Sequence, residues 1–213
     1  HLDQSGKVAL VPIGIIENYT TLRHRLQRLG HRFLSQTDTE VLAHLIGHHL
    51  DQALARKGEV TPERVTQAIF AATREVEGTY AIALIHQGLP GHLFGARRGS
   101  PLVVGLGQDE NFLASDVSPI VAHTRKVVYL HDGDIVTLTN KDFALQARGK
   151  AIQRPISSVD WPAEEAERGK HPHYMLKEIF EQPGRVAEVL RRTLRPAKGN
   201  VEFEEMALKP KEL

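Results

Sequence analysis

The chain has 213 residues, enough for one sizeable core or for one domain with a tail. Its formal net charge of +1 gives no basic field able to hold a polyanion, so nucleic acid is excluded as the expected partner. There is no cysteine, which excludes disulfides, thiolate zinc sites and a cysteine nucleophile among these residues. No apolar run is long enough to cross a bilayer, and His1 opens neither a secretory signal nor a reading frame. We therefore expect a cytoplasmic protein with no membrane partner, and a segment that precedes His1.

The chain begins with the pattern of a strand followed by a helix. Aliphatic residues at 7–11 predict a buried strand that ends at Pro12 and Gly14. Apolar residues spaced three and four apart predict a helix over residues 17–29. Residues 31–34 are a short strand candidate.

Two further helices carry start signals in the sequence. Thr37 with Glu40 fits a capping box, in which each residue's side chain bonds the backbone N–H of the other. Thr61 followed by Pro62 supplies a cap residue and a proline at the first helical position. The third helix is expected to end at Gly78.

The pattern changes after Gly78 to short strands at close spacing, which indicates antiparallel hairpins with Asp132-Gly133 as the sharpest turn signal. The expected strands are 79–86, 93–97, 102–107, 111–115, 127–130 and 135–138, with one or two more in 146–156. Residues 157–170 read as a loop, and helices over 173–181 and 184–194 are separated at Pro183. Helices segregated from an antiparallel sheet predict the α+β class, and two such sheets with helices outside them would form a four-layer sandwich.

Histidines on the second predicted helix raise the question of a metal site. His44 and His48 are four residues apart, with Glu40 one turn earlier, so all three would share a helical face. The sharper His-Glu-x-x-His pattern is absent. A solvated histidine-rich face is favoured, and metal binding remains a minor alternative.

Five sequence motifs, in order, resemble the class II glutamine amidotransferase domain of the glutamine–fructose-6-phosphate aminotransferases. The last of them points to this family rather than to other class II amidotransferases. The motifs are GIIENY at 14–19, TDTEV at 37–41, ARRGSPL at 96–102, ASD at 114–116 and HYMLKEIFEQP at 173–183.

The resemblance implies an N-terminal-nucleophile hydrolase fold, an αββα sandwich incomplete at its N-terminus. In this family an N-terminal cysteine attacks the amide of L-glutamine, with its own α-amino group as general base. The ammonia passes to a sugar-isomerase domain, which makes D-glucosamine 6-phosphate from D-fructose 6-phosphate in an enzyme expected to be a homodimer without cofactor. Residues 1–195 would be the glutaminase domain lacking its first segment, and residues 196–213 a linker toward the sugar domain.

Two site residues follow from the resemblance. Gly14 matches the glycine whose backbone N–H donates to the oxyanion, where a Cβ would keep the backbone from the substrate. Asp38 matches the aspartate that pairs with the α-ammonium of glutamine. Without the resemblance, Gly14 reads as a turn glycine and Asp38 as a helix-start residue.

One position departs from the family. Ile13 stands where the family has an asparagine, whose side chain is the second oxyanion donor, and Pro12 precedes it. We expect weakened glutaminase activity even if a cysteine were supplied, and no activity or glutamine binding from this chain alone. The alternative is a non-catalytic relic or a regulatory binding module of the same fold. The isolated chain would expose strand edges and apolar surface and be prone to aggregate or to be partly disordered. The glutaminase hypothesis requires Gly14 and Asp38 to lie close together.

Overall fold

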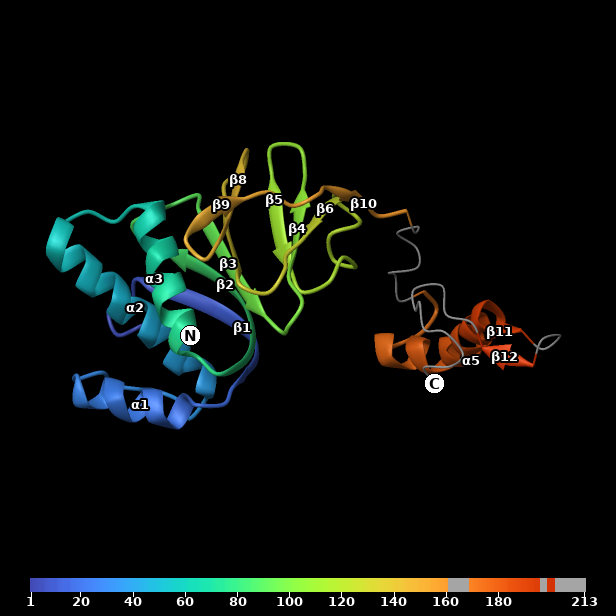
Figure 1. Ribbon diagram of the computed structural model, residues 1–213, viewed down its shortest axis with the longest axis horizontal. Helices are drawn as coiled ribbons and strands as arrows, with labels where there is room; N and C mark the ends of the chain where they lie inside the picture. The colour runs from blue at the N-terminus through green and yellow to red at the C-terminus, as the bar shows by residue number, and fades with distance from the viewer. Residues whose placement is uncertain (161–168, 196–198, 202–213) are drawn as a thin grey trace. The chain divides into compact units, whose positions relative to one another are not determined.

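The computed structural model describes residues 1–160, 169–195 and 199–201, and Figure 1 traces them. It contains two compact units, His1–Ala163 and Glu164–Leu213. Each unit is considered by itself. Most of the predicted linker, 196–198 and 202–213, lies outside the described residues, so the boundary at residue 195 stays a prediction.

Two antiparallel sheets form the first unit. The larger runs in the order β1-β2-β3-β7-β8-β9 and the smaller in the order β10-β6-β4-β5. The larger sheet consists of β1 (Val8–Ile16), β2 (Gly78–His86), β3 (Leu93–Arg98), β7 (Asp134–Leu138), β8 (Phe143–Ala147) and β9 (Lys150–Ile152). The smaller sheet consists of β4 (Val103–Leu106), β5 (Asn111–Ala114), β6 (Lys126–Tyr129) and β10 (Ser157–Ser158).

Three helices complete this unit: α1 (Tyr19–Arg28), α2 (Asp38–Lys57) and α3 (Pro62–Glu75). Helices α2 and α3 cover one face of the larger sheet, and α1 lies beside α2 (Figure 1). Leu45 and Ile46 of α2, fully buried, pack in one core with Leu10, Ile82 and Phe94 of the sheet. This apolar contact is what fixes the helices on the sheet.

A second core joins the two sheets. Val104 and Val128 of the smaller sheet cluster with Val136, Leu138 and Leu145 of the larger one. The order of layers in this unit is therefore helices, sheet, sheet. The predicted α+β class is confirmed, and the starts of α2 and α3 agree with their predicted positions.

Two local predictions around the start of α2 were wrong. Residues 31–34 form no strand, because their N–H groups have other partners. The His31 N–H donates to the Leu26 carbonyl, the Arg32 N–H to the Gln4 side chain and the Leu34 N–H to the Glu40 carboxylate. The capping box does not form, because the Glu40 carboxylate is used by that loop and Thr37 makes no side-chain cap bond. The sequence pattern assigned the N–H groups of residues 31–34 to a strand and the Glu40 carboxylate to a helix cap. In the structure the Leu34 N–H and the Glu40 carboxylate bond each other.

The turn at Asp132-Gly133 exists, but it is not a hairpin turn. Gly133 has φ +84° and the Asp134 N–H donates to the His131 carbonyl, as a tight turn requires. The strands on either side, β6 and β7, belong to different sheets. A turn signal fixes the local bend and leaves the pairing of the flanking strands open.

The second unit contains a helix and a two-stranded ribbon. Helix α5 runs from Tyr174 to Thr193 with Pro183 inside it, so the two predicted helices are one. A proline removes one N–H and leaves the turns on both sides able to stay helical. The ribbon pairs β11 (Leu194–Arg195) with β12 (Asn200–Val201). No helix in the described part of the chain is long and apolar enough to span a bilayer.

Candidate functional site at the free edge of strand β1

Strand β1 is an edge strand, and it is longer than predicted. It continues through Pro12 and Gly14 to Ile16, paired throughout with β2. At its two ends, the Gln87 N–H donates to Lys7 O and the Glu17 N–H donates to Glu77 O. Backbone groups alternate sides along an antiparallel strand, so odd-numbered residues of β1 bond β2 and even-numbered ones face the free edge.

The free edge of β1 is occupied at both ends, and no residue that the structure describes pairs with it between them. The Val8 N–H donates to the Asp3 carboxylate at 3.0 Å, and the Leu10 N–H to the His1 carbonyl at 2.9 Å. Pro12 has no N–H, and because it faces this edge it removes no bond from the ladder with β2. The Ile16 N–H donates to Oδ2 of Asp38 at 2.7 Å.

The N–H of Gly14 therefore lies on the same edge as the Asp38 carboxylate. Gly14 and Ile16 are two positions apart in the strand, a distance of about 7 Å. The two residues that the sequence singled out, 24 positions apart in number (38 − 14), meet at one edge of the sheet. This is the proximity that the glutaminase hypothesis requires.

The backbone at Gly14 explains why a glycine is needed there. Its φ is +132°, and a Cβ would overlap the Thr79 carbonyl oxygen and come within 2.8 Å of Tyr80 Cα. The predicted reason was approach to a substrate. The structure adds a second one, which is close contact with the neighbouring strand β2.

Asp38 is the first residue of α2, where the helix dipole stabilises a carboxylate. The loop before it is held by Glu40, which is 3% exposed. Glu40 accepts from Leu34 N–H at 2.7 Å, from Ser35 N–H at 2.8 Å and from the Ser35 hydroxyl at 2.7 Å. Burial alone would raise the pKa of Glu40, but these hydrogen bonds outweigh it and keep that pKa below its usual value. Sequence reasoning missed this role because it placed Glu40 in a capping box.

Ile13 lies on an exposed apolar face. Its side chain is 50% exposed, and Val11 and Ile15, which point the same way along β1, are 71% and 67% exposed. Ile85 of β2 adds to this face. An isoleucine carries no hydrogen-bond donor, so this side chain offers nothing to an oxyanion.

The histidines of α2 form a cluster with His31. Nδ1 of His31 and Nδ1 of His44 are 3.0 Å apart, and His44 stacks on Phe33. The ring of His48 lies edge-on to His31. Burial, as the largest cause, lowers the pKa of all three rings, and the charge of neighbouring histidines adds to the effect at His44 and His48. No group of three or more metal-binding side chains occurs among the residues described here.

Comparison with known proteins bears on the same residues. A family model described as the glutamine amidotransferase domain matches residues 1–122, which include Gly14, Asp38 and the whole free edge of β1. The glutamine–fructose-6-phosphate aminotransferase (isomerizing) of Thermus thermophilus is 44% identical over 214 aligned positions, covering 100% of this chain and 33% of that protein. The enzyme of the same name from Methanothermobacter thermautotrophicus is 42% identical over 190 positions, covering 89% and 31%. The chain thus spans about a third of the length of these relatives.

A solved structure supports the fold. Glutamine phosphoribosylpyrophosphate amidotransferase from B. subtilis superposes with a TM-score of 0.53 over 69% of this chain and 30% of that one, at 23% identity. At that identity the likeness concerns the fold alone. With the family model covering more than half of its length, the chain belongs to the glutamine amidotransferase domain family.

Proposed function

We propose that this chain is the glutamine-hydrolysing part of a glutamine–fructose-6-phosphate aminotransferase. One observation carries the proposal: the N–H of Gly14 and the carboxylate of Asp38 share the free edge of β1. In this role Asp38 binds the α-ammonium of glutamine and the N–H of Gly14 donates to the oxyanion. The sugar-isomerase domain, the homodimer and the complete four-layer sandwich belong to the longer protein in this proposal.

The hydrogen bonding of Asp38 suits this role. Oδ2 accepts from the Ile16 N–H, which fixes the orientation of the carboxylate, and Oδ1 remains for an ammonium group. Four bonds separate the α-nitrogen of glutamine from its side-chain carbonyl carbon. An extended glutamine held at Asp38 therefore reaches along the strand toward Gly14, about 7 Å from Ile16.

Two features predict that the chain does not turn over glutamine alone. It contains no cysteine, so these 213 residues supply no thiol to attack the amide. Ile13 also offers no second oxyanion donor, and the loss of one such donor costs about 2.7–4 kcal/mol of transition-state stabilisation.

The test is a chimera in which residues 1–195 replace the aligned residues of the Thermus thermophilus aminotransferase. We expect the chimera to release ammonia from glutamine slowly, and Ile13→Asn to raise its kcat by about 100-fold. Asp38→Asn keeps an oxygen for the Ile16 N–H, so it should raise KM for glutamine without unfolding the domain. Asp142→Asn, at an exposed position, is the matched control. An unchanged KM for glutamine in the Asp38→Asn chimera would overturn the proposal. Glutamine turnover by the isolated chain would overturn the prediction that the chain is inactive alone.

Ile13 gives some weight to a second function, a non-catalytic binding module. The same chimera separates the two. A folded chimera that is inactive with Ile13 and stays inactive after the Ile13→Asn change would favour the module. Activity restored by the Ile13→Asn change would favour a glutaminase scaffold.

A further inference from the structure

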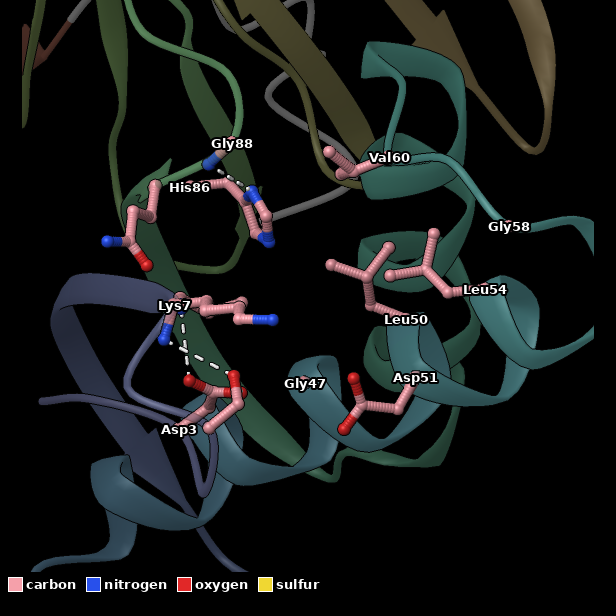
Figure 2. A pocket seen from close by; sticks show the side chains of 13 residues that line it. Asp3, Lys7, Gly47, Leu50, Asp51, Leu54, Gly58, Val60, His86 and Gly88 are labelled. Carbon is pink, nitrogen blue, oxygen red and sulfur yellow. Dashed lines mark hydrogen bonds between the residues drawn. The ribbon is translucent and has the colours of Figure 1, made fainter.

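A cavity of about 290 Å³ lies at the opposite end of β1 from Gly14 (Figure 2). It is bounded by the start of β1, the second half of α2, the segment after α2 and the end of β2. Val8 and Gly14 are six residues apart in an extended strand, or about 20 Å. The cavity is therefore separate from the edge that carries Gly14 and Asp38.

A buried imidazole faces this cavity. His86 is 6% exposed, and its Nδ1 is 3.0 Å from the Gly88 backbone nitrogen. A backbone N–H can only donate, so Nδ1 accepts. Burial lowers the pKa of His86, so the ring is neutral near pH 7 and its proton is on Nε2. Figure 2 shows the ring directed into the cavity, where Nε2 is a donor with no hydrogen-bond partner among the described residues.

Two opposite charges extend into the same space without pairing. The ammonium of Lys7 enters from the start of β1, and the carboxylate of Asp51 enters from α2 (Figure 2). No ion pair joins either group to another charge in the described part of the chain. Both side chains are exposed, so each is available to a ligand.

The third charged group, Asp3, is part of the wall. Its Oδ1 accepts from the Val8 N–H and its Oδ2 from the Ser5 hydroxyl at 2.7 Å. A Cβ on Gly47 would overlap Oδ2 of Asp3, so the glycine allows α2 to approach this carboxylate. Asp3 thus fixes the shape of the site, and Asp51 remains as the acceptor for a ligand.

Leu50, Leu54, Val60 and Val8 supply the apolar part of the lining, and the polar side chains of Ser5 and Gln87 also border the cavity. The cavity lies at the small end of the range for small-molecule sites, about 300–1,000 Å³. Polar groups that converge beside an apolar wall suit a small molecule that is polar at one end and apolar at the other. Its donors and its acceptor are complementary to a molecule that carries a carboxylate, an ammonium and an aliphatic side chain.

We propose that this cavity binds a free aliphatic α-amino acid, with the ligand carboxylate at Lys7 and Nε2 of His86 and its ammonium at Asp51. The ligand's side chain lies against Leu50, Leu54 and Val60. The site is independent of the glutaminase proposal, because it uses none of Gly14, Ile13 or Asp38.

The test is to titrate the full chain with L-leucine and to record ¹H–¹⁵N correlation spectra at each concentration. We expect shifts at the Gly88 N–H, which bonds the ring of His86, and at Gly47 beside Asp3. 4-Methylpentanoate, which lacks the ammonium, and 3-methylbutylamine, which lacks the carboxylate, should each bind at least about tenfold more weakly, as expected for losing a charge-assisted contact.

Exposed substitutions test the roles of the two charges without disturbing the core. Lys7→Gln and Asp51→Asn should each raise Kd for L-leucine by about tenfold or more. Lys150→Gln and Asp142→Asn, exposed on other parts of the first unit, should leave it unchanged. If the Gly47 and Gly88 signals do not shift in up to about 10 mM L-leucine, the Kd lies above that concentration and the affinity is negligible. That result would overturn the proposal. Equal binding of 4-methylpentanoate, or equal affinity in Lys7→Gln and Asp51→Asn, would also overturn it.

Discussion

At the scale of single residues, Gly14 has to meet two structural requirements at once. Its N–H must face the free edge of β1, and its α-carbon must fit against the carbonyl of Thr79. The first demand concerns the proposed chemistry and the second concerns the fold. A substitution at Gly14 therefore affects stability before any question of activity arises.

Gly14→Ala should destabilise the domain strongly. An added methyl group meets the Thr79 carbonyl, and the φ of +132° is unfavourable for alanine. We expect a loss of at least about 2 kcal/mol in the free energy of unfolding, measured with urea. Gly91→Ala is the matched control, since Gly91 also has a positive φ, +79°, but its Cβ position is open. Equal losses in the two variants would show that contact with β2 does not constrain residue 14.

At the scale of elements, the loop between α1 and α2 depends on Glu40. This carboxylate satisfies two backbone N–H groups and a hydroxyl of the loop that leads to Asp38. The loop has little regular structure of its own. One buried side chain therefore holds the part of the loop, at Leu34 and Ser35, that leads into α2.

Glu40→Gln should loosen this loop while leaving α2 in place. A glutamine has one acceptor oxygen, so either the Leu34 or the Ser35 N–H loses its partner, at a cost of about 1–3 kcal/mol. We expect faster hydrogen exchange at both amides and a lower urea midpoint. Glu110→Gln, at an exposed position, provides the control. Unchanged exchange at Leu34 and Ser35 would mean that the loop is held by other contacts.

The elements also show how far sequence patterns reach. Local signals were sufficient for the starts of α2 and α3 and for most strands, because cap residues and apolar periodicity act over a few residues. The side-chain cap bond itself forms at α3 and not at α2. They failed where a side chain bonds a distant backbone, as at Glu40, and where strands change sheets, as after Gly133. The motifs identified Gly14 and Asp38, but only the register of β1 with β2 shows that both face one edge. Lys7, Asp51 and His86 carry no motif, so their common cavity was not predictable from the sequence.

At the scale of the whole molecule, the first unit has two well-packed cores and one uncovered apolar surface. Val11, Ile13 and Ile15 line the face of β1 that α2 does not cover. Exposed apolar surface of this kind favours association. The expected tendency of the isolated chain to aggregate has this surface as its physical basis, and it stays a prediction.

The stability of the first unit should also fall as the solution becomes mildly acidic. Burial lowers the pKa of His31, His44, His48 and His86 in the folded state. Below the unfolded value of about 6.5, the unfolded chain binds protons that the folded chain resists, so the free energy of unfolding decreases as pH falls through this range. Glu40, Glu75 and Asp134 have lowered pKa values, so their contribution is present above about pH 4 and is lost only in stronger acid.

The histidine effect can therefore be measured by itself, with urea midpoints between about pH 7.5 and pH 5.5, where the carboxylates stay ionised. We expect the midpoint to fall over this interval, because burial disfavours the charged form of these rings. At His44 a charge on His31, whose Nδ1 lies 3.0 Å from Nδ1 of His44, adds to the effect. His44→Gln removes one titrating ring and keeps a polar partner for His31, so it should flatten the pH dependence. His24→Gln, on the exposed side of α1, is the control for loss of a histidine side chain outside the cluster. A midpoint independent of pH in the unsubstituted chain would contradict the buried, neutral state assigned to the cluster.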